Sequence, residues 1–108
     1  MKFEEYQEAI KKFAIYPGAG TGNLNALSYT ALGLTEEAGE YAGKISKLLR
    51  DNVFETQLAA KELGDVLWQL TRSATELNLN LADIAQQNID KLEKRIKDGT
   101  LQGSGDTR

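Results

Sequence analysis

The chain has 108 residues, with 13 lysines and arginines against 16 aspartates and glutamates, and no cysteine or histidine. Disulfides, thiolate nucleophiles, Cys/His zinc sites and histidine general bases are therefore excluded. The net charge of −3 argues against a general nucleic-acid binder. No apolar run reaches the roughly 18 residues of a membrane span, and residues 1–10 show no signal-peptide pattern. We expect one cytoplasmic domain over residues 1–108, with no nucleic-acid or membrane partner.

The first predicted helix covers residues 2–15. Its apolar residues recur at steps of three and four and form one stripe: Phe3, Tyr6, Ile10 and Phe13. Pro17 ends this helix, and the Gly-rich residues 16–23 follow as a mobile loop. The loop lacks the Gly-Lys-Ser/Thr ending of a phosphate-binding P-loop, so closure over a nucleotide is the weaker of two interpretations.

The second and third predicted helices cover residues 24–50 and 53–77. Between them, Asn52 is predicted to cap the third helix, with Glu55 as the acidic residue three positions on. Each helix carries a sustained apolar stripe. The second stripe is Leu27, Ala31, Leu34, Ala38, Tyr41, Ile45 and Leu48; the third is Ala59, Leu63, Val66, Leu70, Ala74 and Leu77.

The fourth predicted helix covers residues 81–97, with Asn80 as its N-cap and Gly99 at its C-terminal end. The polar, Gly-rich residues from about 99 onward are predicted to be a flexible tail. No segment alternates as a strand does, and the links between the last three helices are short. The sequence therefore predicts an all-α fold, an antiparallel four-helix bundle, and a helical chain of this length often gains stability by oligomerising.

Two pairs of acidic residues occupy matching positions on the second and third helices. With about 100° per residue, Glu37 and Glu62 each lie about 70° from the centre of their stripe, and Glu40 and Asp65 lie about 60° further out. Glu40 and Glu62 are roughly 16 and 14 Å from the turn between the helices. In an antiparallel hairpin the two pairs would face each other at one level.

Four converging carboxylates repel one another unless a cation lies among them. A hard divalent ion with oxygen ligands is the natural occupant, and Mg²⁺ is the usual partner of phosphates. The alternative is that glutamate is a good helix former and that these side chains are only solvated. A single acidic pair favours that alternative, whereas two pairs at matched angle and height favour a metal site.

Cations lie on the corresponding flanks. Lys44 follows Glu40 by one turn, and the fourth helix carries Lys91 and Arg95 close to the angle of Asn88. Acids with a divalent ion, surrounded by lysine and arginine, suit a polyphosphate. The alternative for Lys91 and Arg95 is a solvated face or pairing with Asp90 and Glu93.

The acidic motifs resemble the ExxE…ExxD signature of the MazG-like all-α nucleoside triphosphate pyrophosphohydrolases. Glu37-x-x-Glu40 is followed after 21 residues by Glu62-x-x-Asp65. The surrounding segments also resemble the family: LGLTEEAGE at 32–40, ELGDVLW at 62–68, NIDKLEKR at 88–95 and GTLQGSGD at 99–106. The resemblance extends over most of the chain from about Tyr16.

This resemblance implies a subunit that forms a homodimer or homotetramer. It implies Mg²⁺, with Mn²⁺ as a substitute, held by Glu37, Glu40, Glu62 and Asp65. It also implies hydrolysis of a nucleoside triphosphate between its α and β phosphates, which gives a monophosphate and pyrophosphate in nucleotide-pool housekeeping.

The remaining roles follow from that reaction. Glu36 is predicted to activate the water, although Glu40 is an alternative base. Lys44, Lys91 and Arg95 would hold pyrophosphate oxygens, and Asn88 would contact a phosphate or a water at the metal. The aromatic residues Tyr16, Tyr29 and Trp68 would stack on a base or belong to the core, and Trp68 alternatively lies at a subunit interface.

Two other functions remain. One is a related enzyme of the same superfamily, specific for dCTP or dUTP or for phosphoribosyl-ATP. The other is a helical interaction module without activity, against which the four intact acids argue.

Overall fold

The computed structural model describes all residues from Met1 to Arg108. The chain is entirely helical: α1 (Phe3–Ala9), a 3₁₀ turn η1 (Ile10–Phe13), α2 (Leu24–Asp51), α3 (Thr56–Glu76) and α4 (Leu81–Lys97). The predicted all-α class with four α-helices is confirmed. None of the helices combines the length and apolarity that crossing a bilayer requires.

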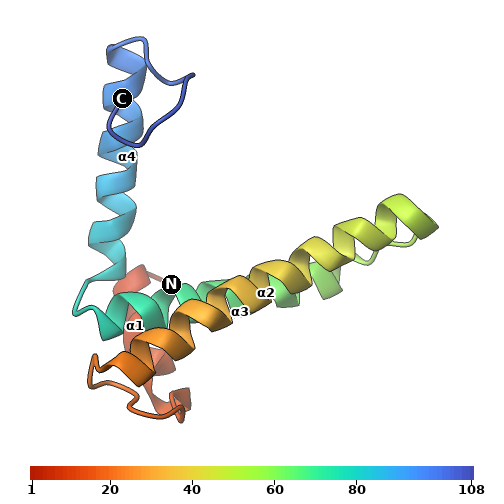
Figure 1. Ribbon diagram of the computed structural model, residues 1–108, viewed down its shortest axis with the longest axis vertical. Helices are drawn as coiled ribbons and strands as arrows, with labels where there is room; N and C mark the ends of the chain where they lie inside the picture. Colours follow the sequence, from red (N-terminus) through yellow and green to blue (C-terminus); the bar gives the residue numbers. More distant parts are fainter.

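The two longest helices, α2 and α3, form an antiparallel hairpin that is the main body of the molecule (Figure 1). The predicted apolar stripes lie only partly in this contact: Ala59 and Ala74 of the third stripe are buried, whereas Leu63, Leu70 and Leu77 are exposed. Gly33 of α2 allows a close approach, because a Cβ at that position would overlap the amide of Gln69 on α3. Gln69 is buried between the helices. The hairpin therefore fixes which residues of α2 lie opposite which residues of α3.

The turn between α2 and α3 differs from the predicted one. Asn52 ends α2 instead of capping α3: it has a left-handed φ of 56°, and its N–H donates to the carbonyl of Leu48. Asparagine tolerates this conformation better than most residues. α3 then begins at Thr56, after Glu55, whose side chain makes no capping hydrogen bond.

The other two predicted ends are confirmed. Asn80 caps α4 by accepting hydrogen bonds from the N–H groups of Ala82 and Asp83. Gly99 follows the last turn of α4 with a φ of 70°, which glycine adopts without strain. The first predicted helix is shorter than expected, because its last turn, Ile10–Phe13, tightens into the 3₁₀ form.

Helix α4 projects away from the hairpin and contacts α1 and the end of α3 (Figure 1). Gln7 of α1 holds the link from α3 to α4: its amide nitrogen donates to the carbonyl of Leu79, and its carbonyl accepts from the N–H of Leu81. The single subunit is thus more open than a closed bundle. Its radius of gyration is 16.5 Å, against about 13 Å for a compact domain of about this length.

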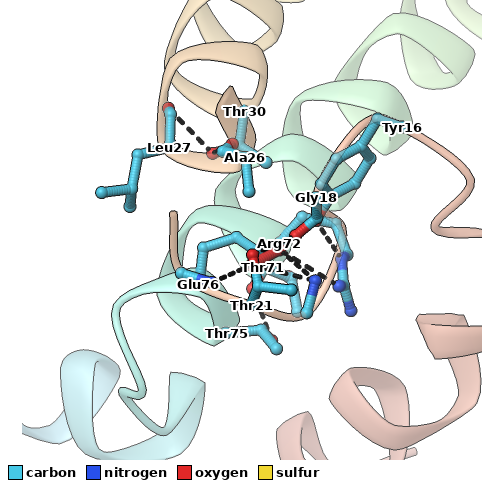
Figure 2. Close-up of polar contacts among 12 residues, drawn as sticks. Tyr16, Gly18, Thr21, Ala26, Leu27, Thr30, Thr71, Arg72, Thr75 and Glu76 are labelled. Atoms are coloured by element: carbon cyan, nitrogen blue, oxygen red, sulfur yellow. Dashed lines mark hydrogen bonds and ion pairs between the residues drawn. The ribbon is translucent and has the colours of Figure 1, made fainter. Parts of the chain in front are cut away.

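The Gly-rich loop before α2 is anchored on a buried carboxylate, that of Glu76 at the end of α3 (Figure 2). Glu76 accepts hydrogen bonds from the Tyr16 hydroxyl at 2.6 Å and from the N–H groups of Gly20 and Gly22 at 2.8–3.0 Å. Arg72, one turn earlier, donates to the Tyr16 oxygen at 2.9 Å and lies 3.5 Å from Glu76. Hydrogen bonds to Glu76 therefore hold this loop in place, and the prediction of a mobile loop is corrected.

The charge of Glu76 is favoured by these partners. Burial by itself raises the pKa of Glu76, but the hydrogen bonds from Tyr16, Gly20 and Gly22, together with Arg72, outweigh burial and leave the pKa below its ordinary value of 4.5. Both oxygens are fully used inside the protein. Glu76 therefore links the loop to α3 and is not available as a metal ligand.

We expect Glu76→Gln to lower the free energy of unfolding by about 3 kcal/mol at neutral pH, because it leaves the buried Arg72 cation without its counter-charge. Urea denaturation measures the loss, and Glu93→Gln on the exposed face of α4 is the control. A lowered folded-state pKa stabilises above pH 4.5 and ceases to do so as pH falls through that pKa. The difference should therefore shrink in acid, and equal stabilities at pH 7 would contradict the assignment.

Candidate functional site

Three carboxylates meet on one side of the α2–α3 hairpin. Glu37 of α2 and Glu62 and Asp65 of α3 each contribute one oxygen to a group in which all oxygens lie within 4.8 Å of one another. Glu37 and Glu62 are half-buried, and Asp65 is exposed. The convergence expected from the helical wheel is thus observed for three of the four acids.

The electrostatics of this acidic cluster are unfavourable without a cation. Burial raises the pKa of Glu37, and the negative charges of Asp65, Glu36, Glu62 and Glu40 raise it further. Oxygen ligands at this separation are the donor set that a hard divalent cation such as Mg²⁺ prefers. This donor set therefore fits a magnesium ion, and it disfavours soft metals, which prefer thiolate ligands.

Glu40 and Glu36 lie beside the acidic cluster without joining it. Both are exposed on α2, and both are close enough to Glu37 to raise its pKa. The role of Glu40 as a ligand and that of Glu36 as a base stay predictions. Lys44 is the neighbouring cation: its Nζ lies 3.7 Å from the Glu62 Oε1, with both side chains largely shielded from solvent.

The three candidate residues of α4 are not brought to the acidic cluster within one chain. Asn88 is exposed. Lys91 donates to the Asp106 carboxylate at 2.9 Å, and Arg95 donates to the same carboxylate and to the Asp106 carbonyl at 2.6 Å. Asp106 belongs to the tail, which folds back along α4 (Figure 1). These two cations are therefore neutralised by the tail rather than by Asp90 and Glu93.

The aromatic residues lie between the loop and the hairpin. Tyr16 stacks on Tyr29 with ring centroids 4.8 Å apart, and Trp68 meets Tyr16 edge-on at 6.2 Å. Tyr16 is buried, whereas Tyr29 is exposed. Trp68 thus has a packing partner within the subunit, on the side of the acidic cluster that faces away from the turn.

Two features near the site had no usable sequence signal. Tyr6 of α1 fits the apolar stripe of its helix in the sequence, yet burial and the charge of Asp65 together raise its pKa. Glu76 reads as an ordinary helical glutamate, although it anchors the Gly-rich loop. Both depend on interactions between residues 54–60 positions apart, which local periodicity does not encode.

Comparison with known proteins agrees with this site. The family model described as "MazG nucleotide pyrophosphohydrolase domain" matches residues 26–100, which contain all the acids of the cluster. The chain is 43% identical over its whole length to the whole of "Gene 37 protein" of Mycobacterium phage L5. No solved structure matches.

Proposed function

Because the chain belongs to the MazG nucleotide pyrophosphohydrolase domain family, as its acidic motifs suggested, we propose that it hydrolyses nucleoside triphosphates to monophosphates and pyrophosphate in the upkeep of the nucleotide pool. The observation that carries this proposal is the meeting of Glu37, Glu62 and Asp65 oxygens within 4.8 Å on the paired helices. The family match alone indicates pyrophosphohydrolase activity in general. The choice of triphosphates rests on the resemblance of the ExxE…ExxD motifs to those of the nucleoside triphosphate pyrophosphohydrolases.

We assign Mg²⁺, with Mn²⁺ as a substitute, to Glu37, Glu62 and Asp65, with Glu40 as the adjoining carboxylate. When bound, the ion neutralises phosphate charge and polarises the phosphorus–oxygen bonds. Lys44 supports the assignment, because it stands 3.7 Å from Glu62 and adds positive charge where the phosphates would lie. A lysine at this point also offsets the repulsion among the acids.

The reaction requires one proton acceptor. The oxygen of a water forms a bond to the α phosphorus, the bond from that phosphorus to the bridging oxygen breaks, and the electron pair leaves with pyrophosphate. Glu36 is assigned to accept the water proton, because it is exposed beside Glu37 and lies outside the group of three oxygens. Glu40 is the alternative acceptor.

Lys91, Arg95 and Asn88 are proposed to serve the site of another subunit in a homodimer or homotetramer. In one chain they lie on α4, which diverges from the hairpin (Figure 1). Large apolar side chains are also exposed on the hairpin and on α4, among them Leu63, Ile89 and Ile96. An apolar face of this kind on a soluble helix is normally covered by a partner.

We expect the purified protein to have the light-scattering mass of two or four chains. Replacing Ile89 and Ile96 by glutamine should shift it toward the monomer, because it removes apolar area from the exposed face of α4. Gln87→Ala, also exposed on α4, is the control. A wild-type mass of one chain at all concentrations would contradict the proposal of a homodimer or homotetramer.

We expect Mg²⁺-dependent release of pyrophosphate from a panel of canonical and modified ribo- and deoxyribonucleoside triphosphates. Asp65→Asn keeps the shape of the side chain but removes a charged oxygen from the cluster. It should lower kcat/KM at least about 100-fold, since metal stabilisation of the transition state is worth several kcal/mol.

Asp83→Asn on α4 is the matched control and should keep full activity. The panel also decides base preference: activity confined to dCTP, dUTP or phosphoribosyl-ATP would place the protein in one of the related enzyme classes. Full activity in Asp65→Asn would contradict the ligand assignment. No turnover of any nucleotide by the wild type would contradict the proposal that the protein is an enzyme.

A further inference from the structure

A cavity of about 280 Å³ lies at the turn end of the hairpin, beyond the acidic cluster. Two lysines of α2, Lys44 and Lys47, line it together with apolar side chains, chiefly Phe54 in the turn and Leu58 at the start of α3. Lys44 belongs to both features, since its ammonium group also lies 3.7 Å from Glu62. Lys44 therefore lies between the cavity and the proposed metal site.

A bound triphosphate needs cations beside the acidic cluster. The acids Glu37, Glu40, Glu62 and Asp65 carry about four negative charges, which one or two divalent ions do no more than neutralise. A triphosphate adds about four more, so further cations are needed to hold it. The metal alone does not supply them.

The hairpin has lysines on one side of the acidic cluster only. Toward the Gly-rich loop the cation is Arg72, which is 2% exposed and committed to Tyr16 and Glu76. Toward the turn, Lys47 follows Lys44 by three residues and so shares its face of α2. Lys47 forms no ion pair within 4 Å.

Two carboxylates, Asp51 and Glu55, line the cavity beside the two lysines. Asp51 is held by the neighbouring Arg50 at 2.7–2.8 Å, and that hydrogen bond lowers its pKa, with a further contribution from the charge of Lys47. Glu55 also lines the cavity and forms no ion pair within 4 Å. The apolar walls of Phe54 and Leu58 exclude part of the water that would otherwise screen the ammonium groups.

We propose that Lys47 joins Lys44 in binding the β and γ phosphates, the half of the substrate that leaves as pyrophosphate, in the cavity at the hairpin turn. This inference rests on the proposed function and adds the orientation of the bound substrate to it. The triphosphate lies along the hairpin with its terminal phosphate toward the turn and its nucleoside toward Tyr29 and Trp68. Lys47, at the outer end, contacts the terminal phosphate and so selects triphosphates over diphosphates.

The test compares the two products as ligands. Calorimetric titration with inorganic pyrophosphate, and separately with a nucleoside monophosphate, is carried out in Mg²⁺ on the wild type and on Lys47→Met. We expect pyrophosphate to bind about tenfold more weakly to the variant, as loss of one charge-assisted contact predicts. Monophosphate affinity should stay the same, and Lys12→Met, remote in η1, should resemble the wild type for both ligands.

A hydrolysis assay adds the second readout. Lys47→Met should lose about tenfold in kcat/KM for a nucleoside triphosphate and little for the diphosphate of the same nucleoside. Equal pyrophosphate affinity in the wild type and in Lys47→Met, or an equal loss for both products, would overturn the inference. Absence of hydrolysis by the wild type would instead overturn the proposed function, so the two failures are distinct.

Discussion

The antiparallel pairing of α2 with α3 is the constraint on which the rest of this molecule depends. The close packing of the two helices fixes their register, and the fit of Gln69 against Gly33 is part of it. Once that register is set, Glu37 of one helix lies opposite Glu62 and Asp65 of the other. The packing that stabilises the hairpin therefore also assembles like charges, at an electrostatic cost that a bound cation would remove.

The parts around the hairpin divide into those that hold it and those that remain open. The buried carboxylate of Glu76 accepts hydrogen bonds from Tyr16 and from N–H groups of the Gly-rich loop. These bonds fix the start of α2 relative to the end of α3 (Figure 2). Helix α4 and the turn end stay exposed. An open subunit of this kind suits a site completed by another copy, with the turn end left for the leaving group.

Periodicity predicted what depends on a single helix or on two adjacent ones. The apolar stripes predicted the extents of α2 and α3 nearly to their ends. The helical-wheel angles predicted the positions of three acids correctly, because both helices are regular and their link is short. Asn80 was predicted as a cap from local chemistry alone. What failed depended on distant or ambiguous signals: Asn52 suits either a cap or a left-handed end, and the direction of α4 is set by Gln7, more than 70 residues away.

The central claim is that the acidic cluster is a divalent cation site, and a titration of the nucleotide-free protein with Mn²⁺, followed by electron paramagnetic resonance, tests it most directly. The wild type and Glu36→Gln, which changes the exposed neighbour outside the group of three oxygens, should bind Mn²⁺ alike. Glu37→Gln should bind it at least about tenfold more weakly, since even supporting residues of metal sites have effects of that size. Equal binding by Glu37→Gln and the wild type, or no binding by either, would contradict the account.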